Sequence, residues 1–155
     1  MKKVLSIVLS MMLVCTMFAC AAETTEEAAT IPAFEVTVVT ADGEVTITEA
    51  TIADLEVVNK DVVKSSKSGE TTNNWTGVNL MDALAEVGVE SFTTLSVEAS
   101  DGYAADYDLE MAEATLIAYL MDGEELGEDG PVNTVIDGGS ASAWMKNFTK
   151  VTVVE

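Results

Sequence analysis

Apolar and polar residues alternate with a period of two along the chain from Phe34 to residue 39. An Asp42-Gly43 pair follows, and a second alternating run occupies residues 45–48. Successive side chains of a strand point to opposite faces, so each run is typical of a half-buried strand. Since an Asp-Gly pair between two such runs is a common two-residue turn, the pattern predicts a β-hairpin.

Helical spacing appears further along the chain. Within residues 79–87 apolar side chains recur at intervals of three and four residues, and Gly88 follows as a stop. Asn79 is a suitable cap for the first turn. Gly77 is expected to let the backbone turn into this helix, because glycine tolerates conformations that other residues avoid.

The other expected elements are short. A helical turn is expected at 51–55 with Thr51 as its cap. Further strands are expected at 61–67, 94–99, 116–120, 134–136 and 151–154, and a further helix at 109–114. Several strands with only short helices between them predict an α+β fold built on a mixed β-sheet with short helices.

The N-terminus has a different pattern. Lys2 and Lys3 precede an uncharged run over residues 4–22. A basic start, an apolar stretch and then small residues are typical of a secretory signal, which we place at residues 1–20. A retained membrane anchor is the alternative, but no basic cluster follows the run. Residues 21–33 are polar and are expected to be a disordered linker.

The end of the signal contains a candidate lipidation site. Met17-Phe18-Ala19-Cys20 resembles a bacterial lipobox, in which the cysteine becomes acylated and starts the mature chain. Ala19-Cys20-Ala21 also satisfies the small-x-small rule of ordinary signal peptidase, so plain secretion is the alternative. We predict lipidation of Cys20, an extracytoplasmic location, and membrane contact only through the lipid.

Cysteine content limits the chemistry of the mature part. The chain has two cysteines, Cys15 and Cys20, and both fall in the predicted signal. The mature chain is therefore expected to have no disulfide, no thiolate ligand and no cysteine nucleophile. The roughly 120 residues from 34 to 155 suffice for one hydrophobic core and are too few for two ordinary domains.

The net charge and the types of charged residue exclude further classes of function. The chain carries 27 acidic residues against 7 basic ones, all of them lysine, and it has no histidine. Removal of Lys2 and Lys3 with the signal leaves 5 lysines against the 27 acids, a net charge of −22. Such a surface repels phosphate backbones, so no nucleic-acid partner is expected. The lack of histidine excludes Ser–His–Asp catalysis and removes the commonest metal ligand.

Several short motifs occur in a particular order. Trp75-Thr76-Gly77-Val78-Asn79-Leu80 is followed by Ala83-Leu84 and Gly88-Val89. Four further pieces follow: Ser100-Asp101-Gly102-Tyr103, Ala118-Tyr119-Leu120-Met121-Asp122-Gly123, Gly130-Pro131-Val132 and Trp144-Met145-Lys146-Asn147-Phe148. Together they resemble the sulfite-oxidase-like molybdopterin-binding domain, over residues 34–155. The resemblance implies that family's fold, with molybdopterin as the cofactor and an oxidoreductase activity.

The chain departs from that family at the residues that carry the chemistry. The family ligates molybdenum through a cysteine just before the W-x-G motif, and here residues 64–74 contain hydroxyls and amides but no cysteine. A serine oxygen is a poor substitute for the thiolate. The family also holds the pterin phosphate with arginines and often a histidine, whereas Asn133 stands at one arginine position. We therefore expect no catalytic residue, no metal ligand and no bound cofactor.

The chain retains residues that would suit a weaker anion site. Lys146 matches the family's lysine and can hold phosphate as a point charge. The loop 137–143 offers backbone N–H groups for an anion nest, although such a loop is also typical of an ordinary turn. Tyr103 and Trp144 combine apolar area with a polar tip, which suits a cleft wall. The candidate cofactor-binding residues are Lys146, Asn74, Gly138, Gly139, Ser140 and Tyr103.

The acidic stretch 122–130 is a candidate calcium loop, but its spacing does not match the twelve-residue EF-hand and a solvated turn is expected. Two classes of function remain. One is a molybdopterin-dependent oxidoreductase of the sulfite oxidase type. The other is a non-catalytic envelope module that binds an unknown small-molecule or protein partner.

The predicted lipidation of Cys20 can be tested on the exported protein. We expect the mature chain to begin at an acylated Cys20, because this cysteine directly follows the apolar run. Mass spectrometry of the membrane fraction measures both the first residue and the added acyl mass. A free chain in the medium that begins at Ala22 would contradict lipidation.

Overall fold

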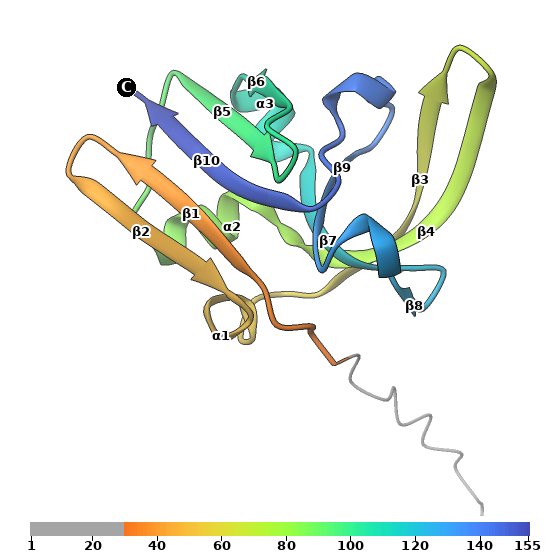
Figure 1. The fold of residues 1–155 in the computed structure, drawn as a ribbon, viewed down its shortest axis with the longest axis horizontal. Helices are drawn as coiled ribbons and strands as arrows, with labels where there is room; N and C mark the ends of the chain where they lie inside the picture. The colour runs from red at the N-terminus through yellow and green to blue at the C-terminus, as the bar shows by residue number, and fades with distance from the viewer. Residues whose placement is uncertain (1–29) are drawn as a thin grey trace, which may run out of the picture.

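The computed structural model describes residues 30–155 (Figure 1). The predicted signal with Cys20, and all but the end of the predicted linker, lie outside the described residues. Among residues 30–155, no helix is long and apolar enough to cross a membrane. The described chain forms two five-stranded sheets with three short α-helices.

The first sheet contains the predicted hairpin. Its strands are β1 (Glu35–Thr40), β2 (Gly43–Thr48), β5 (Thr94–Ala99), β6 (Ala104–Tyr107) and β10 (Phe148–Val154). The order across the sheet is β2-β1-β10-β5-β6. β1 and β2 pair antiparallel with Val38 opposite Val45, so the hairpin prediction is confirmed. β1 runs parallel to β10, and this pair makes the sheet mixed.

The second sheet is antiparallel throughout. Its strands are β3 (Val58–Ser66), β4 (Gly69–Asn79), β7 (Thr115–Met121), the short β8 (Glu124–Glu125) and β9 (Asn133–Ile136). β3 and β4 form a long hairpin that extends beyond the rest of the sheet (Figure 1). The prediction of an α+β fold is confirmed, with two sheets in place of one.

The helices lie in the connections between strands. They are α1 (Glu49–Ile52), α2 (Leu80–Glu86), α3 (Leu109–Glu113) and the 3₁₀ turns η1 (Gly127–Asp129) and η2 (Ala141–Ala143). Asn79 caps α2 as predicted, since its side chain accepts a 2.8 Å hydrogen bond from the Met81 N–H. The cap of α1 is Thr48, and the predicted cap Thr51 lies inside the helix, where its hydroxyl accepts a hydrogen bond from the Thr48 N–H.

One hydrophobic core joins both sheets. Val36, Val97 and Val151 from the first sheet and Val78 and Ile117 from the second are fully buried in the same cluster. The buried cluster extends along the chain from residue 34 to residue 151, so both sheets form a single unit.

The sequence pattern missed β4, β6 and the two-residue β8, and it assigned Gly77 the wrong role. Residues 69–74 are all polar apart from the glycine, and they lie in the half of the hairpin that covers no core. Strand formation there depends on pairing with β3. The sequence therefore shows no alternation of apolar and polar residues that would predict this strand. Gly77 lies inside β4 and not at a turn. A Cβ at this position would be 2.2 Å from the carbonyl oxygen of Ile117 on β7.

This close approach generates a stability prediction. We expect Gly77→Ala to lower the free energy of unfolding by about 3 kcal/mol or more, because β7 must move to admit the methyl group. Gly88→Ala is the control: it has φ +86° and open space around it. Its cost is that of a left-handed residue alone, about 1 kcal/mol. Urea unfolding midpoints of both variants measure the difference, and equal losses would contradict the steric explanation.

Candidate functional site

A cavity of about 280 Å³ lies between the β3–β4 hairpin and the segment from η1 to β10. We call it the hairpin cavity. Its lining residues come from β3, β4, the end of β7, η1, β9 and the chain before β10: Lys64, Thr71, Asn73, Trp75, Met121, Asp129, Asn133, Thr134, Trp144, Met145 and Lys146. The volume is near the lower end of the range for small-molecule sites.

Two tryptophans and a lysine form one wall of the hairpin cavity. The rings of Trp75 and Trp144 meet edge to face, with centroids 5.6 Å apart and an interplanar angle of 80°. The Lys64 ammonium lies 4.9 Å from the centroid of the Trp144 ring, a cation–π arrangement. Trp144 Nε1 donates to the carbonyl oxygen of Ile136 at 3.1 Å. Trp75 Nε1 is buried and has no hydrogen-bond partner among the described residues.

Lys146 lines the hairpin cavity, as the sequence analysis predicted for a binding residue. Its ammonium is engaged, however, because it donates to Asp129 Oδ1 at 2.7 Å. Both side chains are largely exposed, so the pair contributes little to stability. Its electrostatic effect is local: the Asp129 carboxylate neutralises the charge that an anion would need.

Buried polar groups hold the floor of the hairpin cavity. Tyr107 on β6 donates its hydroxyl proton to the carbonyl oxygen of Ala143. Thr134 Oγ1 therefore donates to the Tyr107 hydroxyl oxygen at 2.8 Å, and it accepts from the Met145 N–H at 2.9 Å. Asn133 Oδ1 accepts from the Asn147 N–H at 2.8 Å. These bonds tie the chain before β10 to both sheets.

Both glycine amides of the predicted anion nest donate to backbone carbonyls within the fold. The Gly138 N–H donates to the Val63 carbonyl oxygen at 3.3 Å, and the Gly139 N–H donates to the Ile136 carbonyl oxygen at 3.1 Å. Ser140 pairs with β3 through an isolated bridge. The loop pairs with the hairpin and does not line the hairpin cavity.

Asn74 and Tyr103 also lie outside the hairpin cavity. The Asn74 amide donates to Asn59 Oδ1 and Asp61 Oδ1, at 2.9 and 3.0 Å, on the opposite face of the hairpin. Tyr103 is about half exposed, and its hydroxyl donates to the Ser142 carbonyl oxygen at 2.9 Å. Its neighbour Asn73 lines the hairpin cavity instead, because neighbouring residues of a strand face opposite ways.

Sequence reasoning missed the β4 residues of the site. Thr71, Asn73 and Trp75 all line the hairpin cavity, and Lys64 lies opposite Thr71 in the hairpin register. Their spacing of two would have placed them on one face, had residues 69–79 been assigned to a strand. The motif tryptophan Trp75 was the available signal for that assignment.

The acidic residues do not form a cation site in the described structure. Among residues 30–155, no group of three or more potential metal ligands is close enough to hold an ion. Asp122, at the start of the acidic stretch, accepts from the Asn73 amide and from the Asn74 N–H, both at 2.9 Å. These two hydrogen bonds lower the pKa of the Asp122 carboxyl, and the bond from Asn73 has the larger effect. Its role is to fasten the β7–β8 turn to β4.

Fold and cavity together define a two-sheet α+β domain with a small pocket beside a long hairpin. The family model described as "Oxidoreductase molybdopterin binding domain" matches residues 22–155. The chain belongs to this family, and the resemblance found in the sequence is confirmed. A comparison with curated proteins finds no match.

A solved structure has a similar fold. It is the crystal structure of the sulfane dehydrogenase SoxCD from Paracoccus pantotrophus, with a TM-score of 0.68 and 16% sequence identity. The match covers 78% of this chain and 38% of that chain. This chain thus spans well under half the length of that relative, and at this identity the likeness establishes the fold alone.

The buried floor of the hairpin cavity generates a pH prediction. Burial raises the pKa of Tyr107 from 10.0 to about 12, against a smaller lowering by the Thr134 hydrogen bond. Between these values the phenol ionises in the unfolded chain but stays neutral in the folded one. The free energy of unfolding is therefore unaffected below the unfolded pKa and falls by roughly 2–3 kcal/mol as the pH rises through the folded pKa.

Urea unfolding midpoints across this alkaline range measure the loss. Tyr107→Phe removes the ionisable hydroxyl, so its midpoint should fall less steeply with pH. Equal slopes for the two proteins would contradict the assignment of the loss to Tyr107. Burial also raises the pKa of Tyr119, which leaves a residual slope in the variant.

Proposed function

We propose that this chain is a non-catalytic member of its family that binds a small molecule in the hairpin cavity. In this proposal Cys20 carries a lipid that holds the domain at the extracytoplasmic face of a membrane, and no nucleic acid is bound. The observation that carries it is the set of residues that line the hairpin cavity. They offer amides, hydroxyls and tryptophans where a molybdenum enzyme needs a thiolate and a strong phosphate grip.

The molybdopterin cofactor does not fit these residues. The positions on β4 that reach the hairpin cavity are Thr71, Asn73 and Trp75, and none of them supplies a sulfur ligand. The phosphate would have to be held by lysine, because the chain has no arginine and no histidine. Lys146 is already paired with Asp129, and Lys64 offers a point charge without the bidentate grip of an arginine. A net charge of −20 adds a general repulsion of an anionic cofactor.

Family membership supports the fold but does not determine the activity, because domains with one fold can differ in whether they carry a catalytic site. The activity named for the sulfane dehydrogenase belongs to a much longer chain. A cavity near the lower size limit for ligand sites favours a small molecule over a protein as the partner.

Elemental analysis tests the proposal. We expect less than a tenth of a molybdenum atom per chain in protein purified from a host that makes the cofactor and exports loaded proteins, because the ligand set above cannot hold it. Asn73→Cys places a thiol in the hairpin cavity, while Ser66→Cys places one at the hairpin tip, outside it. Neither variant should gain molybdenum, because the phosphate grip is still missing.

Molybdenum near one atom per wild-type chain, together with turnover of an oxidisable substrate, would contradict the proposal. It would support the molybdopterin-dependent oxidoreductase of the sulfite oxidase type.

A further inference from the structure

One wall of the hairpin cavity contains a buried hydrogen-bond donor without an acceptor. Trp75 is 6% exposed, and its Nε1 has no acceptor among the described residues. A buried N–H without an acceptor destabilises the folded chain, so such groups call for an explanation. Trp75 lines the hairpin cavity, and a ligand that supplies an acceptor there would satisfy this donor.

Asn133 adds a second side-chain donor. Its side chain is almost fully buried, and its Oδ1 accepts from the Asn147 N–H. Within residues 30–155 its NH₂ group has no hydrogen-bond acceptor, but it is not among the fully buried unpaired atoms, so solvent reaches it. Because Asn133 lines the hairpin cavity, this NH₂ group is a donor for a ligand there.

Lys64 supplies a positive charge that Lys146 cannot. Lys60, Lys146 and Lys150 each have a carboxylate within 4 Å, whereas Lys64 has none among the described residues and lies over the Trp144 ring. Lys64 is partly buried, so its charge acts in a less polar environment than bulk water. Asp129 is the one carboxylate that lines the hairpin cavity, and Lys146 neutralises it.

The remaining lining is apolar and small. Met121, Met145 and the two tryptophan rings face the hairpin cavity beside these donors. Its 280 Å³ would hold roughly nine water molecules at about 30 Å³ each. This limits the ligand to about the size of a single substituted ring.

We infer that the hairpin cavity binds a small monocarboxylate with an apolar body of about the size of benzoate. The carboxylate faces Lys64 and the N–H donors of Trp75 and Asn133, and the body lies against the methionine and tryptophan side chains. Charge-assisted hydrogen bonds are the strongest that such a site can offer. This inference rests on the proposed function, because it requires that molybdopterin does not occupy the hairpin cavity.

Three probes of similar shape test it: benzoate, the neutral benzamide and the cationic benzylammonium. The chain has two tryptophans, so a nitrogen-15 NMR spectrum of the exported mature chain should contain two indole N–H signals. Trp144 Nε1 already has an acceptor, so the new hydrogen bond to the carboxylate is expected at Trp75. We expect benzoate to shift the Trp75 signal saturably, benzamide to bind about tenfold more weakly, and benzylammonium to leave the signal unchanged.

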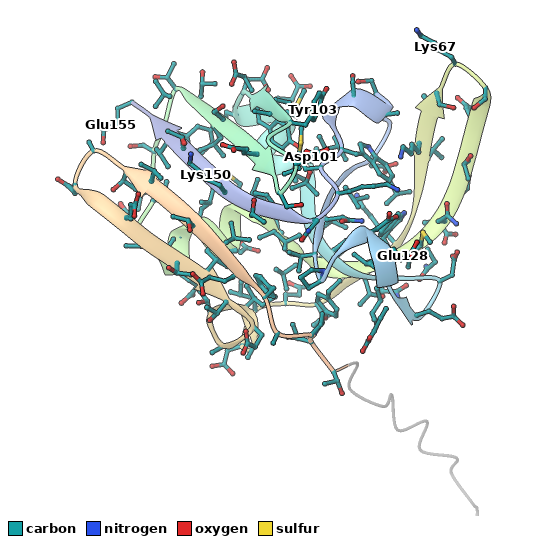
Figure 2. The ribbon with its side chains drawn as sticks, viewed as in Figure 1. Lys67, Asp101, Tyr103, Glu128, Lys150 and Glu155 are labelled. Atoms are coloured by element: carbon teal, nitrogen blue, oxygen red, sulfur yellow. The ribbon has the colours of Figure 1, made fainter. Side chains whose placement is uncertain are left out.

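Matched variants locate the charge that the carboxylate needs. Lys64→Met keeps an apolar side chain on Trp144 and should weaken benzoate binding about tenfold. Lys150→Met makes the same change of net charge at β10, on the other side of the molecule from the hairpin, and should leave the affinity unchanged (Figure 2). Trp75→Phe removes the N–H donor and identifies the Trp75 signal by its loss.

The inference is overturned if benzoate leaves the Trp75 signal unshifted, if benzamide or benzylammonium binds as well as benzoate, or if Lys150→Met matches the effect of Lys64→Met. Molybdenum content measured on the same preparation separates the two proposals. A molybdenum-free chain that ignores benzoate contradicts this inference alone, whereas a molybdenum-loaded chain contradicts the proposed function.

Discussion

The backbones of β4 and β7 meet at Gly77 with no room for a side chain between them, and much of the domain depends on this contact. The ladder between the two strands shifts its register between Thr76 and Gly77. Trp75 lies two residues before this point and turns its ring toward the hairpin cavity, while α2 begins three residues after it. One close approach therefore positions both the tryptophan wall and the helix that covers the core.

The hairpin cavity is held open by polar bonds in addition to apolar packing. The Tyr107 hydroxyl, the Thr134 hydroxyl and the Ala143 carbonyl connect β6 of the first sheet with β9 and η2. Asn133 performs a related task, because its side-chain oxygen fixes the turn at Asn147 that follows Lys146. Asn133, which lines the hairpin cavity, is thus also part of its scaffold.

Charge is distributed unevenly over this acidic protein. Lys60 and Lys64 lie on β3, and Lys67 lies at the hairpin tip, away from the body of the domain (Figure 2). Lys146 faces the same hairpin across the hairpin cavity. Lys60 and Lys146 are paired with carboxylates, so Lys64 is the lysine at the hairpin cavity that favours the approach of a small anion to this molecule of net charge −20.

The sequence by itself determined the elements with a repeating apolar pattern. The β1–β2 hairpin, α2 and β5 follow from period-two or helical spacing, because burial of one face dictates those patterns. Ordered motifs around Trp75 and Trp144 were enough to indicate the family. The absence of arginine and histidine, and of any cysteine after Cys20, is likewise read from the sequence alone.

Only the tertiary structure decided which polar residues meet. β4 forms from polar residues because β3 lies beside it, so the sequence pattern could not show that Asn73, and not Asn74, lines the hairpin cavity. The pairing of Lys146 with Asp129 spans 17 residues, and the use of the Gly138 N–H by Val63 spans a longer separation. Such contacts depend on how distant segments pack, and local spacing carries no information about them.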